Sequence, residues 1–91
     1  MPYITEEKRR LLIAVENLKN TIISPDNFGP RDKGGALNYL FTVLMKGILN
    51  NDKRYATAEQ LIGACECAKL ELYRREIAPY EDEKIKENGD V

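Results

Sequence analysis

The stretch "ALNYLFTVLMKGIL", Ala36–Leu49, decides the fold class of this chain. Its apolar residues recur at intervals of three and four, which places Leu37, Leu40 and Leu44 along one face of a helix. The stretch is shorter than the ~20 residues that a membrane-spanning helix needs, and it contains an asparagine and a lysine. It therefore predicts a buried helix in a protein that does not span a membrane.

The sequence on both sides of this stretch predicts further helices and no strand. Thr5 is a good N-cap, Thr57 with Gln60 forms a capping-box pattern, and Asn88-Gly89 is a good C-cap. Pro79 is suited to the first turn of a short helix. We therefore expect an all-α fold: a small three-helix bundle with a short C-terminal helical segment. It forms a single helical domain over residues 1–91, with helices at about 5–22, 33–50, 57–78 and 80–87.

The predicted third helix is apolar on two sides. At 100° per residue, Leu61 and Cys65 lie on one face, while Ile62, Tyr73 and Ile77 lie on another. One small chain needs only one such face for its own core, and a helix with two is either central in the bundle or in contact with another subunit. We therefore expect a homo-oligomer, most simply a symmetric dimer.

Composition excludes several classes of function. The 91 residues include no histidine, which removes the commonest general base and the commonest metal ligand. The formal net charge of -1 argues against nucleic acid and against an anionic membrane surface as partners. Cys65 and Cys67 point about 200° apart on a helix and cannot bridge to each other. We interpret both cysteines as small packing residues, and unpaired cysteines are typical of proteins in a reducing cytoplasm.

Two segments carry residues suited to an anionic ligand. In "GPRDKGG", Gly29–Gly35, a glycine-rich helix start carries the positive charges of Arg31 and Lys33, although the segment lacks the ending of a P-loop. Its last two glycines either precede the helix or mark a close approach of the backbone to another group. The alternative is an ordinary flexible loop.

The second segment is the end of the third helix. Glu66, Lys69, Tyr73 and Glu76 form a polar strip at spacings of three and four, which is either a set of helical ion pairs or a binding cluster. Glu71 is placed to pair with the arginines that follow Tyr73. The ligand-binding residues that we predict are Arg31, Lys33, Lys69, Tyr73, Arg74, Arg75 and Tyr80, which would neutralise charge and stack on a planar group. No catalytic residue, metal ligand or cofactor is predicted.

One enzymatic alternative stays open. Small all-α nucleotide pyrophosphohydrolases hold magnesium with carboxylates on facing helices, and they carry a tight Glu-x-x-Glu arrangement on a core helix. The glutamates here are spread over the helices, and no such box recurs on two of them. We therefore expect a protein that is not an enzyme, with a metal-dependent nucleotide hydrolase as the alternative.

The block "KLELYRREIAPYEDEKIKENGDV", Lys69–Val91, resembles a family of short proteins encoded in bacteriophage and prophage genomes, and the resemblance extends back to about Gly35. It implies a phage accessory protein in the cytoplasm of a bacterial host, acting on host defences by binding. The leading hypothesis is sequestration of an anionic nucleotide signal between subunits. The alternative is a protein-binding inhibitor of a host defence or nucleic-acid-processing complex.

Overall fold

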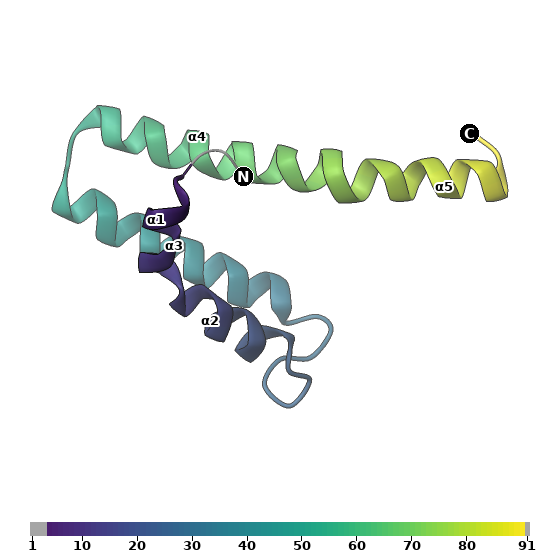
Figure 1. Cartoon of the computed structure of the whole chain (residues 1–91), viewed down its shortest axis with the longest axis horizontal. Helices are drawn as coiled ribbons and strands as arrows, with labels where there is room; N and C mark the ends of the chain where they lie inside the picture. Colours follow the sequence, from purple (N-terminus) through teal and green to yellow (C-terminus); the bar gives the residue numbers. More distant parts are fainter. Residues whose placement is uncertain (1–3, 91) are drawn as a thin grey trace. The chain divides into compact units, whose positions relative to one another are not determined.

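The computed structural model describes residues 4–90, and within this range every regular element is a helix (Figure 1). The all-α prediction is confirmed, whereas the three-helix bundle and the single domain stay predictions. None of the described helices combines the length and the apolar character that crossing a membrane requires. Within α3 (Lys33–Asn51) the chain divides into two units, Met1–Leu44 and Met45–Val91.

The first unit begins with a helix that changes character along its length. Thr5 caps α1 (Glu6–Arg9) by accepting a hydrogen bond from the Lys8 N–H, which confirms the predicted N-cap. A 3₁₀ turn η1 (Arg10–Leu12) follows, and α2 runs over Ala14–Ile23. The sequence predicted one uninterrupted helix here. The interruption includes Leu11, Leu12 and Ile13, which are exposed and which no other described element covers. Their conformation therefore depends on local hydrogen bonds alone.

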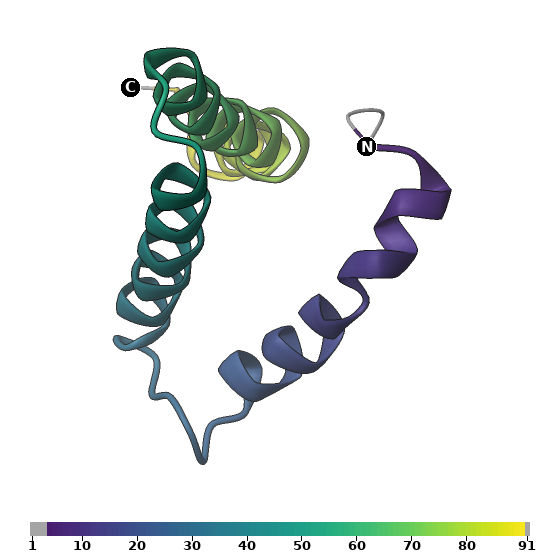
Figure 2. The ribbon, with the colours of Figure 1, turned by 90° about the vertical axis from the view of Figure 1, so that its left-hand side faces the viewer.

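A turn-rich loop joins α2 to α3 in the first unit. Asn27 and Phe28 donate backbone hydrogen bonds to the Ser24 carbonyl, and the Asp32 carboxylate accepts from the Gly29 N–H. Figure 2 shows that α2 and the first half of α3 meet at this loop and diverge from it. Side chains of both helices line a groove between them.

The second unit is a helix hairpin with one long arm. The last turns of α3 lead through Asp52 into α4 (Tyr55–Leu72), and Figure 1 shows α4 continuing through the π turn η2 (Tyr73–Ile77) into α5 (Ala78–Asn88). The contact between α3 and α4 includes Met45 and Cys65, whose sulfur atoms are 3.4 Å apart. Both cysteines are free, as predicted.

The π turn explains why the helix passes Pro79 without ending. Proline lacks an N–H, and its ring would clash with the carbonyl four residues earlier, that of Arg75. Just before it, the Ala78 N–H donates to the Tyr73 carbonyl five residues back, which widens the helix at this point. The predicted helices at 57–78 and 80–87 are thus joined, and α5 ends as predicted at Gly89, whose φ is 81°.

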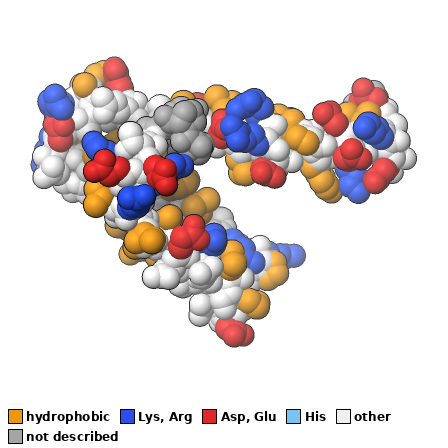
Figure 3. Space-filling model, in the orientation of Figure 1, with side chains coloured by type: hydrophobic (Ala, Val, Ile, Leu, Met, Phe, Trp, Pro, Cys, Tyr) orange, Lys and Arg blue, Asp and Glu red, His pale blue; other side chains and the backbone are white. Residues whose placement is uncertain are grey.

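No apolar side chain among residues 4–90 is buried. The prediction that Ala36–Leu49 is a buried helix is therefore wrong for the chain on its own. Phe41, Leu44 and Ile48 all stay exposed, because within each unit α3 is flanked by a single further helix. Figure 3 shows the apolar side chains lying at the surface among the charged ones. The helices present apolar faces that nothing in the described chain covers.

Candidate functional site

The groove between α2 and α3 is an apolar concave surface of the first unit. It has a volume of about 320 Å³ and is lined by Val15, Leu18, Lys19, Ile22, Ile23, Leu37, Leu40, Phe41 and Leu44. Both helices carry these residues at spacings of three and four, so the groove follows directly from their amphipathic pattern. Lys19 is its one charged lining residue, and it pairs with Glu16 at 2.7 Å.

A second cavity adjoins the groove at the loop end. It has a volume of about 430 Å³, and Leu18, Ile22 and Leu40 line both cavities. Phe28 and Tyr39 give it two aromatic walls, and the start of α3 contributes Gly35 and Ala36. The two cavities thus form one apolar surface with an aromatic end. The aromatic end lies near the start of α3, where Lys33 is the first residue and Arg31 comes just before it.

The glycine-rich segment is part of the helix rather than a loop before it. α3 begins at Lys33, so that Gly34 and Gly35 lie in its first turn. A Cβ built on either glycine would meet no atom within 4 Å, and no close approach of the described chain explains them. Arg31 and Lys33 form no ion pair among the described residues, which leaves their charges available to a ligand.

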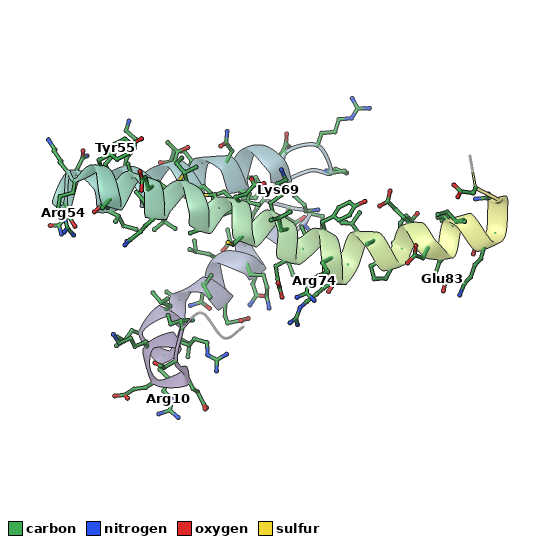
Figure 4. All side chains as sticks on the ribbon, turned by 90° about the horizontal axis from the view of Figure 1, so that it is seen from above. Arg10, Arg54, Tyr55, Lys69, Arg74 and Glu83 are labelled. Atoms are coloured by element: carbon green, nitrogen blue, oxygen red, sulfur yellow. The ribbon has the colours of Figure 1, made fainter. Side chains whose placement is uncertain are left out.

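The predicted binding residues of the second unit are engaged with carboxylates of their own helix. Arg74 and Arg75 both bind Glu71, Arg74 through Nη2 at 3.1 Å from Oε2, and Lys69 lies 3.3 Å from Glu66. Figure 4 shows Lys69 and Arg74 spaced along the continuous helix, with Arg74 projecting from it. The two arginines hold the pKa of Glu71 below its ordinary value, chiefly through the hydrogen bond from Arg74.

The two aromatic candidates also have partners. The Tyr73 hydroxyl donates to Glu81 Oε1 at 2.5 Å, and this hydrogen bond, with the negative charge of the carboxylate, raises the pKa of Tyr73. The Lys84 ammonium lies 5.6 Å from the ring centroid of Tyr80. Within the polar strip, Glu66 and Lys69 form a helical ion pair, which is one of the two alternatives that the sequence left open.

The seven predicted residues are divided between the two units. Arg31 and Lys33 belong to the first unit and Lys69, Tyr73, Arg74, Arg75 and Tyr80 to the second, so each group is a separate candidate. Sequence reasoning missed the apolar groove as a site, although the spacing of apolar residues on both helices was the signal for it. It had treated those residues as core.

A polar cluster at the start of α4 was also missed. Asp52 accepts hydrogen bonds from Arg54 Nε at 2.7 Å, from Arg54 Nη2 at 2.6 Å and from the Thr57 hydroxyl at 2.9 Å. The bonds from Arg54 and then Thr57 lower the pKa of Asp52. The predicted capping box on Thr57 is wrong. α4 begins at Tyr55, two residues before Thr57, and the Thr57 hydroxyl donates its hydrogen bond to Asp52 rather than capping the helix. An aspartate in the short turn before a helix was the signal for this cluster.

Within residues 4–90, no group of three or more metal-binding side chains lies close enough together to hold an ion. A family model described as "Domain of unknown function (DUF6899)" matches residues 1–91. No curated protein and no solved structure matches the chain.

Proposed function

The chain belongs to the family of the domain of unknown function DUF6899, and we propose that it acts by binding another protein through the groove between α2 and α3. The observation that supports this is the uncovered apolar surface of the groove, to which Leu18, Leu37 and Leu44 contribute exposed side chains. Exposed apolar surface of this kind marks sites of protein–protein interaction. A hydrophobic groove between two helices accommodates the apolar face of a third helix, which supplies the missing layer of the predicted three-helix bundle.

The partner that fits this groove is an amphipathic helix with apolar residues at spacings of three and four. Burial of such a face is worth about 25 cal/mol per Å² of apolar surface, so that a few large side chains supply most of the binding energy. The resemblance of the C-terminal block to phage proteins supports a partner in a bacterial host. We therefore propose an inhibitor of a host defence or nucleic-acid-processing complex that works in the cytoplasm and without catalysis.

Two neighbouring substitutions test the groove. Leu44 and Val43 are both exposed on α3, but only Leu44 lines the groove. A carboxylate at position 44 should weaken capture of the partner from host lysate at least tenfold, because desolvating an unpaired charge costs several times the ~1.4 kcal/mol that this factor requires. Val43→Asp should leave capture within about twofold. Equal effects of Leu44→Asp and Val43→Asp would exclude the groove as the binding surface.

Sequestration of an anionic nucleotide is the second candidate. It is favoured by Arg31 and Lys33, which lack ion-pair partners among residues 4–90 and lie next in sequence to the cavity with aromatic walls. A base would stack on Phe28 or Tyr39, while its phosphate would meet the start of α3. The three candidate cations of the second unit, Lys69, Arg74 and Arg75, contribute less, because each has a carboxylate partner.

Calorimetry against a panel of cyclic nucleotides tests this second candidate. Heat from one of them that disappears in the Arg31→Ala/Lys33→Ala double variant would support it. Heat that persists in the double variant would remove Arg31 and Lys33 from the site. The absence of heat with every nucleotide, from correctly folded protein, would remove this function altogether.

A further inference from the structure

The outer half of the long helix has a face that no other element covers. Among the described residues of the second unit, α5 contacts chiefly the π turn that leads into it. Residues 62–88 span about 40 Å at 1.5 Å per residue, and isolated helices depend on packing for most of their stability. Ile62, Leu70 and Tyr73 are all more than half exposed. This helix therefore presents an apolar face on which another surface can pack.

The π turn aligns residues before and after it on one face. It adds about one residue to a turn. In a regular helix, residues seven apart lie on the same face, and across the π turn this spacing becomes eight, which places Glu81 on the same face as Tyr73. The hydrogen bond between Tyr73 and Glu81 shows this alignment directly. With the same correction, one stripe runs along the helix through Ile62, Lys69, Tyr73, Ile77, Glu81 and Ile85. Arg75 and Glu71 lie on the opposite side and bind each other.

The middle of the stripe, from Lys69 to Glu81, is complementary to its own reverse. Lys69 lies six residues before Arg75 and Glu81 six residues after it, while Tyr73 and Ile77 lie two residues before and after. In an antiparallel pair related by a twofold axis, positions equidistant from the axis face each other. With the axis on the stripe side of the helix, at the level of Arg75, Lys69 meets Glu81 of the second copy, and Tyr73 meets Ile77 of the second copy. Each contact occurs twice.

We propose that this stripe is the surface on which a second copy of the chain binds, antiparallel, with the twofold axis crossing the stripe between Tyr73 and Ile77. The proposal rests on the proposed function in one respect, that the chain acts through uncovered apolar helix faces, and it identifies one partner as the chain itself. It uses the α4–α5 stripe and leaves the groove between α2 and α3 to the other protein. Tyr73 and Ile77 supply the apolar centre, and Lys69 and Glu81 set the direction.

The apolar side chains of the stripe are exposed and can supply the apolar part of such a contact. Ile62 is 69% exposed, Tyr73 51%, Ile77 41% and Ile85 43%. The charges of the stripe are compatible with pairing, because Lys69 already neutralises Glu66 and would lie between two carboxylates.

A charge exchange tests the contact. Lys69→Glu and Glu81→Lys each place like charges against each other at two symmetric contacts, and each should weaken the dimer about tenfold in sedimentation equilibrium. The double variant Lys69→Glu/Glu81→Lys should return the dissociation constant to within about threefold of the original. Within one chain these residues are separated by about 18 Å of helix, so rescue arises only between copies.

Lys86→Glu is the matched control, because Lys86 lies off the stripe and pairs with Glu83 at 3.7 Å. It should leave the dimer unchanged. A monomeric native protein, single variants without effect, or a double variant that is not rescued would each overturn the proposal. The outcome is separable from that of the groove: Leu44→Asp tests capture of the other protein, whereas the charge exchange is read on the purified protein alone.

Discussion

Replacing Gly47 with alanine should stabilise the protein. Gly47 lies in the interior of α3, in the second unit, and a Cβ built on it meets no atom within 4 Å. In a helix interior, alanine is favoured over glycine by about 0.8–1.0 kcal/mol, because glycine loses more backbone freedom on folding. For a protein of this length, that gain corresponds to an increase in Tm of roughly 3–8 °C.

Thermal denaturation followed by far-UV circular dichroism measures this change. Wild type and variant are compared at several matched concentrations, because self-association makes Tm depend on concentration. Gly89→Ala is the control with the opposite sign, since the φ of 81° and ψ of 155° at that position are essentially confined to glycine and strain alanine by about 1–3 kcal/mol.

A decrease in the Tm of Gly47→Ala would refute the reasoning. It would mean that another surface approaches the backbone of α3 so closely that a methyl group does not fit. The outer face of α3 in the second unit would then be a contact rather than open surface. The same result at every protein concentration would place that contact within one chain, and a decrease only at high concentration would place it between chains.

Three further predictions concern local interactions. The pKa of Asp52 is lower in the folded state than in the unfolded state, so its contribution to stability is present at pH above the unfolded pKa and is lost as the pH falls through the folded pKa. Melting curves of Asp52→Asn recorded at acid pH should lack this part of the pH dependence. Pro79→Ala removes the reason for the π turn, so a regular helix should form and the raised pKa of Tyr73 should fall in a spectrophotometric titration. Cys67 is exposed and Cys65 is half-buried against a methionine, so a thiol reagent should modify Cys67 first, as peptide mass mapping would show.

The sequence predicted features that depend on a few neighbouring residues. The N-cap at Thr5 and the glycine C-cap at Gly89 are both confirmed, as are the ion pairs of Glu71 with the two arginines that follow Tyr73. Each depends on side-chain and backbone groups within four residues, so the local sequence suffices. The candidate residues Arg31 and Lys33 stay a prediction, with Lys33 at the start of α3 and Arg31 just before it.

Features that depend on other elements were not predictable in the same way. Pro79 was identified as a boundary, but the sequence does not reveal that a π turn absorbs it and keeps the helix continuous. The capping box at Thr57 failed because Asp52, on the other side of the turn, binds the threonine hydroxyl. In both cases two local solutions satisfy the same backbone groups, and the surrounding geometry selects one.

The sequence by itself determined the helical class of this protein, the amphipathic faces of its helices and most of their ends, because helix periodicity and capping are local properties. Only the tertiary structure decided which apolar faces stay uncovered. The number of layers around Ala36–Leu49 depends on contacts between distant residues, and amphipathic periodicity is the same whether the covering surface comes from the same chain or from another. The exposed faces of α3 and α4 are therefore where the structure adds most to the sequence, and where the proposed partners bind.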